Sequence, residues 1–391
     1  MIPLRNAKRF LFKAYNQPCY ALKVFKKRLM AYLYYYLSNG KSSYPEAVTL
    51  FLTHRCNLHC KMCGQWGEGG VTRKQSAEYI REELSFDELK MVIDDLSPFG
   101  PNITLFGGEP LIYKNSIDTI KYIKNKNMHC LMITNGSLIE PKAQELVDAG
   151  LDELNVSLDG GRELHNEIRG MDGLFDRVLN GLKKINHFKK EKNKKRPFIN
   201  LQCTITKYNY ENLEQLLNAA EETGADSLTF HNLIFLENGL IEKQKKYDKL
   251  LNCSSLDWKG FISVPDIDVS ILFNKMEEIK KKVTEMAEKG FDLKVDFYPN
   301  FSKKGLFEYY QNPLFLPREY SPRCVSPWIS AYIFPDGETR PCLNFDYSFG
   351  NIKKDKFTLI WNGERARNFR KTLKRNKIFP VCIRCTELYR Y

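Results

Sequence analysis

Short apolar runs alternate with amphipathic helical patterns from about residue 46 to residue 235, and this alternation constrains the fold more than any other feature of the chain. Strands that alternate with helices pair in parallel through right-handed crossovers. Six such units predict an α/β protein built on a curved parallel sheet, a partial (β/α)6 barrel. The expected strands are residues 47–52, 103–106, 130–133, 153–158, 199–205 and 227–233.

Helix start and stop signals separate these strands. Ser85 and Glu88 have the spacing of a capping box at the beginning of the first expected helix. Gly150 and Gly224 follow two others, as expected where helices end. The expected helices are residues 85–96, 116–125, 141–149, 173–188 and 210–223.

Polar residues and glycines directly follow four of the expected strands, at residues 53–63, 107–110, 134–136 and 159–161. In a TIM-like barrel the carboxyl ends of the strands share one rim, and chemistry is located there. We therefore expect these four segments to form the functional rim. The basic loop 189–196 belongs to the opposite rim, where a solvated loop is favoured over a nucleic-acid patch.

Three cysteines define the first of these segments. Cys56, Cys60 and Cys63 have the spacing C-x3-C-x2-C on one short loop. Four thiolates would fully ligate a four-iron cluster, whereas three leave one iron open to a small molecule. The alternative is a zinc loop with His54 or His59 as its fourth ligand.

The cysteine loop after the first strand, Gly107-Gly108-Glu109-Pro110 after the second and Ser157-Leu158-Asp159-Gly160 at the fourth together resemble the radical S-adenosylmethionine (SAM) superfamily. The resemblance covers roughly residues 46–235. It implies a [4Fe–4S] cluster on Cys56, Cys60 and Cys63, with the amino and carboxylate groups of SAM on the open iron. It also implies reductive cleavage of SAM to a 5'-deoxyadenosyl radical that abstracts hydrogen from a substrate carbon.

The same resemblance assigns SAM contacts along the second strand. Gly107, Gly108 and Glu109 would meet the SAM amino group. Glycines allow the backbone to approach a ligand, and a carboxylate matches an ammonium group. An ordinary turn is the alternative for the two glycines.

Further SAM contacts would come from the fourth unit. Ser157 and Asp159 resemble positions that meet polar parts of SAM, and Arg169 could pair with its carboxylate. The alternatives are a turn at Asp159 and a surface charge at Arg169. Met62 departs from the family, which often has an aromatic residue there, but a thioether can fill the same space near adenine.

Four more cysteines lie near the C-terminus. Cys324 and Cys342 flank Gly337, and Cys382 and Cys385 follow as a C-x2-C pair. This set resembles a SPASM extension, shortened to the twitch type that holds one auxiliary [4Fe–4S] cluster on four thiolates. A four-cysteine zinc site is the alternative. We therefore expect an auxiliary-cluster domain at residues 321–391, after a connecting region at 236–320 that contains a helix near 273–289.

The N-terminal 45 residues form a separate basic, aromatic arm. They contain nine of the 60 basic residues and none of the 47 acidic ones, so residues 46–391 carry 51 basic and 47 acidic residues, a net charge of only +4. On a helix, Leu22, Phe25, Leu29, Leu33 and Tyr36 would lie on one face. Such a helix could contact an anionic membrane or pack this face on the barrel; a transit peptide is a lesser alternative.

These features predict an iron–sulfur oxidoreductase or maturase, with flavodoxin or ferredoxin as an electron donor. Family resemblance favours a peptide or protein side chain as substrate, and a small metabolite, sugar or lipid is the rival. A non-catalytic metal-binding or nucleic-acid-binding protein would explain the cysteines and the charge, but not the clusters on the rim. No secretory signal is present, so we expect a cytoplasmic protein, and residues 1–45 are a candidate for peripheral contact with a membrane. No catalytic acid or base can be named.

Overall fold

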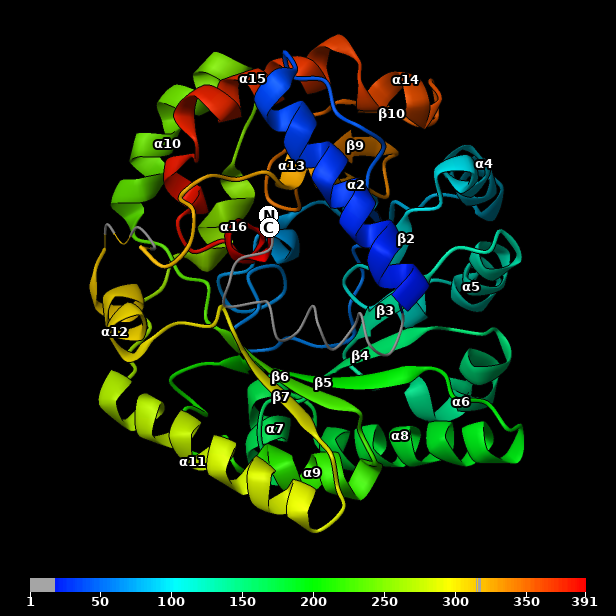
Figure 1. Cartoon of the computed structure of the whole chain (residues 1–391), viewed down its shortest axis with the longest axis vertical. Helices are drawn as coiled ribbons and strands as arrows, with labels where there is room; N and C mark the ends of the chain where they lie inside the picture. Colours follow the sequence, from blue (N-terminus) through cyan, green and yellow to red (C-terminus); the bar gives the residue numbers. More distant parts are fainter. Residues whose placement is uncertain (1–17, 314, 316–317) are drawn as a thin grey trace.

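The computed structural model describes residues 18–313, 315 and 318–391. Ten strands in this part of the chain form one sheet in the order β10-β9-β8-β1-β2-β3-β4-β5-β6-β7 (Figure 1). The strands are β1 (Ala47–Phe51), β2 (Asn102–Phe106), β3 (Cys130–Thr134), β4 (Glu153–Ser157), β5 (Phe198–Ile205), β6 (Ser227–Asn232), β7 (Lys294–Tyr298), β8 (Ser330–Ile333), β9 (Glu338–Arg340) and β10 (Gly350–Asn351). Strands β1 to β7 are parallel, which confirms the six expected units and the partial barrel.

Helices surround the curved sheet (Figure 1). The predicted capping box is present, because Ser85 accepts from the Glu88 amide and the Glu88 carboxylate accepts from the Ser85 amide. Most of the helices turn apolar side chains to one large core. The helices are α2 (Pro18–Leu37), α3 (Ala77–Arg81), α4 (Phe86–Leu96), α5 (Ser116–Asn125), α6 (Ile139–Asp148), α7 (Arg162–Arg169), α8 (Leu174–Glu191), α9 (Gln215–Thr223), α10 (Asn238–Leu251), α11 (Val269–Glu288), α12 (Lys303–Gln311), α13 (Ser326–Ile329), α14 (Phe357–Trp361), α15 (Glu364–Asn376) and α16 (Thr386–Arg390).

Both edges of the barrel sheet differ from the six-strand expectation. The region expected only to connect the two domains contributes β7, which pairs in parallel with β6, and α11 where a helix was expected. On the other edge β8 pairs in parallel with β1, and β9 turns back antiparallel to β8. The C-terminal cysteine module therefore extends the sheet of the barrel, because its first strand adds to the open edge of β1.

Helix α2 confirms the helical prediction for the described part of the arm; residues 1–17 lie outside the described residues. The helix docks through Ala21, Ala31 and Tyr35, all of which are buried. Arg28 forms a two-point ion pair with Glu46, with N···O distances of 3.1 and 2.8 Å. The expected alternative, in which the Leu22–Tyr36 stripe packs on the barrel, is wrong for these residues, because α2 buries Ala21, Ala31 and Tyr35 and leaves the stripe exposed.

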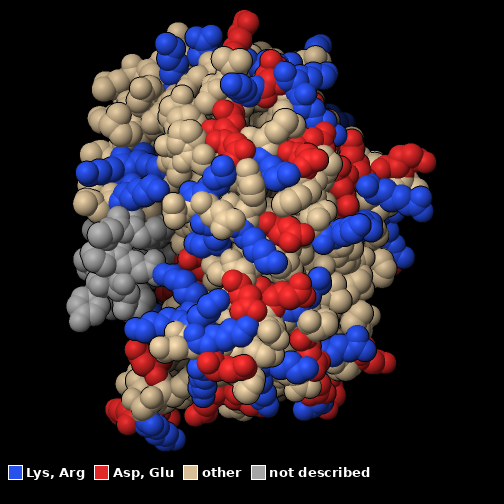
Figure 2. Space-filling model, turned by 90° about the vertical axis from the view of Figure 1, so that its right-hand side faces the viewer, with Lys and Arg blue, Asp and Glu red and all other residues tan. Residues whose placement is uncertain are grey.

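Charges are interspersed on the body of the molecule, as Figure 2 shows for one face. In the basic loop at residues 189–196, Lys192 and Lys194 pair with Asp148, and Arg196 lies 3.7 Å from Asp152. This pairing supports the solvated-loop interpretation rather than a nucleic-acid patch. In the described part of the chain, no helix combines the length and the apolar composition needed to cross a bilayer.

Candidate active site

The cysteine loop begins where β1 ends, at the predicted rim. The Cys63 amide donates to the Cys60 carbonyl at 3.0 Å, which closes a tight turn between these two ligands. The Trp66 indole donates to the His54 carbonyl at 2.8 Å and ties the end of the loop to its beginning. The backbone therefore holds Cys60 and Cys63 on one tight turn, with Cys56 on the same loop.

Each of the three sulfur atoms has one N–H donor, and each donor comes from a different element. The Trp66 amide lies 3.3 Å from Cys63 Sγ. Asn135 Nδ2, after β3, and Arg169 Nη1, at the end of α7, each lie 3.8 Å from a sulfur atom, of Cys56 and Cys60 respectively. N–H groups aimed at cysteine sulfur are the outer contacts that tune an iron–sulfur cluster.

The chemistry of these thiols fits a metal cluster. Burial raises the pKa of Cys56 to about 12 and also raises the pKa of Cys60. Such thiols ionise readily only beside a strong positive charge, which bound iron supplies.

The two glycines after β2 allow close approach between backbone segments. A Cβ on Gly107 would lie 2.6 Å from the Thr53 carbonyl oxygen, and one on Gly108 would lie 2.2 Å from that of Arg55. The Gly108 amide donates to Thr53 O, and the Glu109 amide to Arg55 O. These glycines therefore allow the cysteine loop to pack against the end of β2, and the contact of Gly107 and Gly108 with SAM stays a prediction.

Glu109 is fully buried, and its carboxylate accepts three hydrogen bonds from the protein. The donors are the Leu111 amide, the Thr134 hydroxyl and the Asn135 amide, at 3.0, 2.7 and 2.7 Å. Burial raises the pKa of Glu109, and the three hydrogen bonds oppose this rise. The carboxylate joins the ends of β2 and β3, and so it also positions Asn135 beside Cys56.

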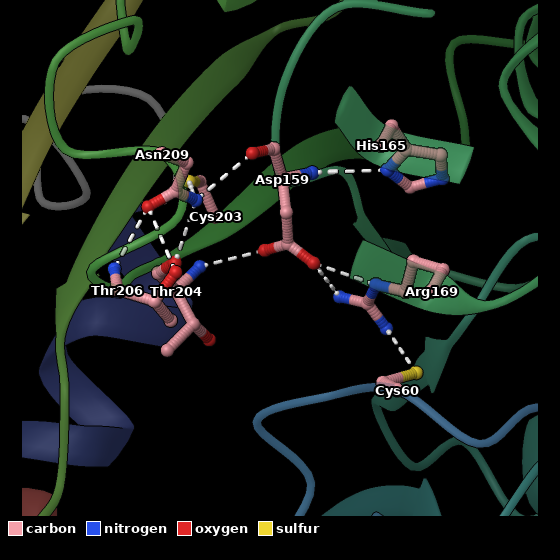
Figure 3. A network of polar contacts seen from close by, with 8 residues as sticks. All are labelled: Cys60, Asp159, His165, Arg169, Cys203, Thr204, Thr206 and Asn209. Carbon is pink, nitrogen blue, oxygen red and sulfur yellow. Dashed lines mark hydrogen bonds and ion pairs between the residues drawn. The ribbon is translucent and has the colours of Figure 1, made fainter. Parts of the chain in front are cut away.

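Asp159 and Arg169 form a buried ion pair beside the cysteine loop (Figure 3). Arg169 Nε and Nη2 both lie 2.6 Å from Asp159 Oδ2, while Nη1 points to Cys60 Sγ. Burial acts to lower the pKa of Arg169, but Asp159 and Cys60 outweigh it and raise this pKa, so the guanidinium stays charged. The pair is therefore part of the rim, and the surface-charge alternative for Arg169 is wrong.

A network of hydrogen bonds around Asp159 supports this ion pair (Figure 3). The Thr204 amide donates to Asp159 Oδ1, and the fully buried Asn209 donates to the carbonyl of Asp159 at 2.9 Å. His165 Nδ1 accepts from the Asp159 amide, and burial together with Arg169 lowers the pKa of His165 to about 3. The sequence analysis did not identify Thr204, Asn209 or His165 as parts of the site; the polar Thr206–Asn209 segment directly after β5 was the available signal.

Two residues that were predicted to contact SAM are only half-buried in the structure. Ser157 is the last residue of β4 and is half-buried at the rim. Met62 is half-buried against the core. Both positions stay predictions for SAM contact.

The four C-terminal cysteines come together at one cavity. Cys324, Cys342, Cys382 and Cys385 all line it, together with Trp258 and three phenylalanines, Phe345, Phe369 and Phe379. Burial raises the pKa of all four thiols, to about 12 for Cys342. A largely apolar, aromatic cavity with four thiols fits one fully ligated auxiliary cluster.

One short helical segment, η5 (Leu256–Phe261), touches both cysteine sites. Trp258 lines the auxiliary cavity, and Gly260 packs so closely on Gly64 that a Cβ would lie 2.1 Å from the Gly64 carbonyl oxygen. Gly64 directly follows Cys63. The connecting region thus joins the two sites, which its weak sequence pattern did not reveal.

Three thiols on one rim loop and four around one cavity define an iron–sulfur protein of two sites. Residues 50–222 match the family model of the radical SAM superfamily, and residues 324–386 match the SPASM iron–sulfur cluster-binding domain. The chain belongs to the radical SAM superfamily. It is an enzyme that binds SAM, a [4Fe–4S] cluster and an auxiliary iron–sulfur cluster.

Similar proteins agree with this assignment. The chain is 31% identical over 327 residues to the Fe-coproporphyrin III synthase of Methanosarcina barkeri, covering 79% of this chain and 72% of that protein. It is 26% identical to the AdoMet-dependent heme synthase of the same organism, covering 87% and 88% of the two chains. The fold resembles SuiB of Streptococcus suis bound to SAM, with a TM-score of 0.61, 16% identity, and 92% and 72% of the two chains covered.

Proposed function

We propose that this enzyme abstracts a hydrogen atom from a substrate carbon and completes a net oxidation by passing one electron to its auxiliary site. The observation that carries this proposal is the cavity lined by four cysteines, joined to the first site through η5. The cluster on Cys56, Cys60 and Cys63, when bound, supplies the electron that cleaves SAM to methionine and a 5'-deoxyadenosyl radical. Flavodoxin or ferredoxin is the proposed donor of that electron.

The chain's own residues bind and orient SAM. Arg169, fixed by Asp159, would place its charge where the SAM carboxylate meets the loop at Cys60. The Gly107–Glu109 edge would receive the SAM amino group. Replacing Glu109 with Gln should weaken SAM binding by roughly 1.5–3 kcal/mol, about 10–150-fold. An unchanged affinity for SAM would contradict this contact and would show that Glu109 has only a structural role, through its hydrogen bonds with Leu111, Thr134 and Asn135.

The auxiliary site suits electron transfer rather than substrate binding. Four cysteines line its cavity, so a four-iron cluster there would have no open iron for a substrate. Loss of a hydrogen atom leaves a carbon radical on the substrate. Removal of one electron and one proton from it then gives the oxidised or cross-linked product, and the electron leaves through the auxiliary site.

Two substrate classes remain candidates. A peptide or protein side chain is the class that the sequence favoured. An iron tetrapyrrole is favoured by a different observation: two relatives that align with more than three quarters of this chain are named for the synthesis of Fe-coproporphyrin III and heme.

The test is the release of 5'-deoxyadenosine by the reduced, anaerobically reconstituted protein. We expect slow release with SAM alone and faster release with a true substrate. Iron coproporphyrin and a library of peptides would be assayed in parallel, with deuterium transfer from the substrate as the second readout. No 5'-deoxyadenosine under any condition would contradict the proposed chemistry, and a signal with only one class would decide the substrate.

A further inference from the structure

Helix α2 leaves its apolar stripe on the surface, and we propose that this stripe docks the enzyme on an anionic lipid bilayer. The outer stripe consists of Leu22, Phe25, Leu29, Leu33 and Tyr36, and every member is exposed. Leu29 and Leu33 keep 49% and 43% of their surface accessible. Met30 and Leu37 of the same helix are exposed as well.

The concentration of these residues is unusual for this molecule. Seven of the fifteen exposed large hydrophobic residues of the described chain lie on this one helix of 20 residues. Single exposed apolar residues are ordinary, whereas a contiguous patch marks an interaction site.

The stripe borders a groove of about 410 Å³ between α2 and residues 319–323. Phe25, Leu29 and Leu33 form one wall, and Tyr320 and Tyr391 lie opposite. Glu319 also lines the groove, and its carboxylate accepts from Ser302. An apolar groove open to the surface can receive part of a lipid chain while the helix lies in the plane of the interface.

The charge around the stripe specifies the partner. Helix α2 has no acidic residue, and Lys23 and Lys26 are exposed beside the stripe. At its other end the Arg323 guanidinium lies 5.3 Å from the Tyr36 ring, and Lys374 bonds the Tyr36 carbonyl. A cationic rim around an apolar stripe complements a bilayer that contains anionic lipid.

The structure also separates docking residues from folding residues. Lys27 donates to the carbonyls of Pro45 and Gly100, and Arg28 pairs with Glu46, so both belong to the contact with the barrel. Lys23, Lys26, Leu29 and Leu33 can therefore be replaced without removing a buried contact.

The test is sedimentation of the anaerobic full chain with vesicles of phosphatidylcholine, with and without phosphatidylglycerol. We expect binding only to the anionic vesicles, with release as the ionic strength rises and the Debye length shrinks below about 8 Å. Replacing Lys23 and Lys26 with Gln should weaken binding about 30-fold, at roughly 1 kcal/mol per charge. Replacing Leu29 and Leu33 with Ser should abolish it at an unchanged melting temperature.

Matched controls come from surfaces on other sides of the molecule. Lys281→Gln with Lys282→Gln on α11, on the opposite side of the ring in Figure 1, and Leu250→Ser on α10 should leave vesicle binding unchanged. Absence of vesicle binding overturns the proposal. A dimer in solution that Leu29→Ser and Leu33→Ser convert to a monomer would assign the stripe to a second copy, and a lowered melting temperature would assign it to contacts within the chain.

A second observation concerns the auxiliary cavity and carries a separate inference. Trp258 is buried, and its indole Nε1–H has no hydrogen-bond partner among the described residues. The same side chain lines the cavity of the four cysteines. We infer that this N–H donates to a sulfur atom of the auxiliary cluster and raises its reduction potential, since such hydrogen bonds stabilise the more negative, reduced form.

The chain supplies a matched control for this inference. Trp328 is equally buried, and its Nε1–H is also unpartnered among the described residues, but it does not line the cavity. In redox titrations followed by electron paramagnetic resonance, Trp258→Phe should shift the auxiliary midpoint to a more negative potential. A tenfold change in the ratio of reduced to oxidised cluster would be 59 mV for a one-electron couple. Trp328→Phe should shift neither midpoint.

A second measurement uses the protein with Trp258 in place, so its result does not depend on whether Trp258→Phe folds. Protein labelled with 15N in its tryptophan indoles should show nitrogen coupling to the reduced auxiliary cluster, and Trp328→Phe should retain it. No coupling in the labelled protein, or equal shifts in the two variants, would overturn the inference.

Discussion

The two cysteine sites differ in how the chain assembles them. Cys56, Cys60 and Cys63 lie on one loop, and polar groups from β3, α7 and the loop itself reach their sulfur atoms. The four auxiliary cysteines come from separate segments between Cys324 and Cys385, and aromatic side chains line the same cavity. Three thiolates leave one iron of a four-iron cluster open to a small molecule, whereas four thiolates leave none, so the second site suits electron transfer. The following predictions test this contrast.

Removal of the first site should have the largest effect. The reconstituted protein should hold about eight irons, four per cluster. With Cys56, Cys60 and Cys63 all replaced by Ala, about half of the iron and all SAM cleavage should be lost. Iron analysis and assay of 5'-deoxyadenosine measure both; zinc in the oxygen-free wild-type protein would contradict the cluster assignment.

Removal of the second site should have a narrower effect. Cys382→Ala should leave SAM cleavage intact and stop product formation, because Cys382 lines the auxiliary cavity and is not on the cysteine loop at the rim. The measurement is the ratio of 5'-deoxyadenosine to product. If SAM cleavage also stops, the first site depends structurally on the second, which would contradict the separate roles proposed for the two sites.

The polar support of the first site should be costly to break. Asp159→Asn leaves the Arg169 charge buried without a counter-ion, so we expect a loss of about 3–5 kcal/mol in the free energy of unfolding. Anaerobic chemical denaturation measures it. Asp176→Asn, which breaks the exposed pair with Arg162, is the control and should cost less than about 1 kcal/mol. Equal losses in the two variants would show that the buried pair has no special role.

The smallest effect should appear in the pH dependence of stability. His165 has a folded pKa of about 3 against 6.5 in the unfolded chain, so the unfolded state binds the extra proton below pH 6.5. Its contribution is complete above that pH and is lost as the pH falls toward 3. Between pH 7.5 and 5.5 the wild type should lose about 1.4 kcal/mol that His165→Gln does not lose. Parallel curves for the two proteins would contradict the assignment.

The local patterns explain why so much of the fold was predictable. Six strands, their helices and the Ser85 capping box follow from apolar periodicity and end signals, which act over a few residues. The cysteines were identifiable because ligand spacing on one loop is a local property. Strands β7 and β8 were missed because each gains its place from a neighbour far away in the sequence, β6 and β1 respectively.

The sequence by itself determined the chemistry: the ligand types, their spacing and the order of the units that bring them to one rim. Only the tertiary structure decided which groups support them. It placed Asn135, Arg169 and Trp66 on the three sulfur atoms, and it turned the glycines after β2 toward the cysteine loop. It also decided which face of α2 packs inward: Ala31 and Tyr35 lie in the core, with the Tyr35 ring 4.9 Å from the ring of Trp328 in α13, while the side chains of the stripe remain outside. Periodicity can identify an apolar face, but shape complementarity decides which face is buried.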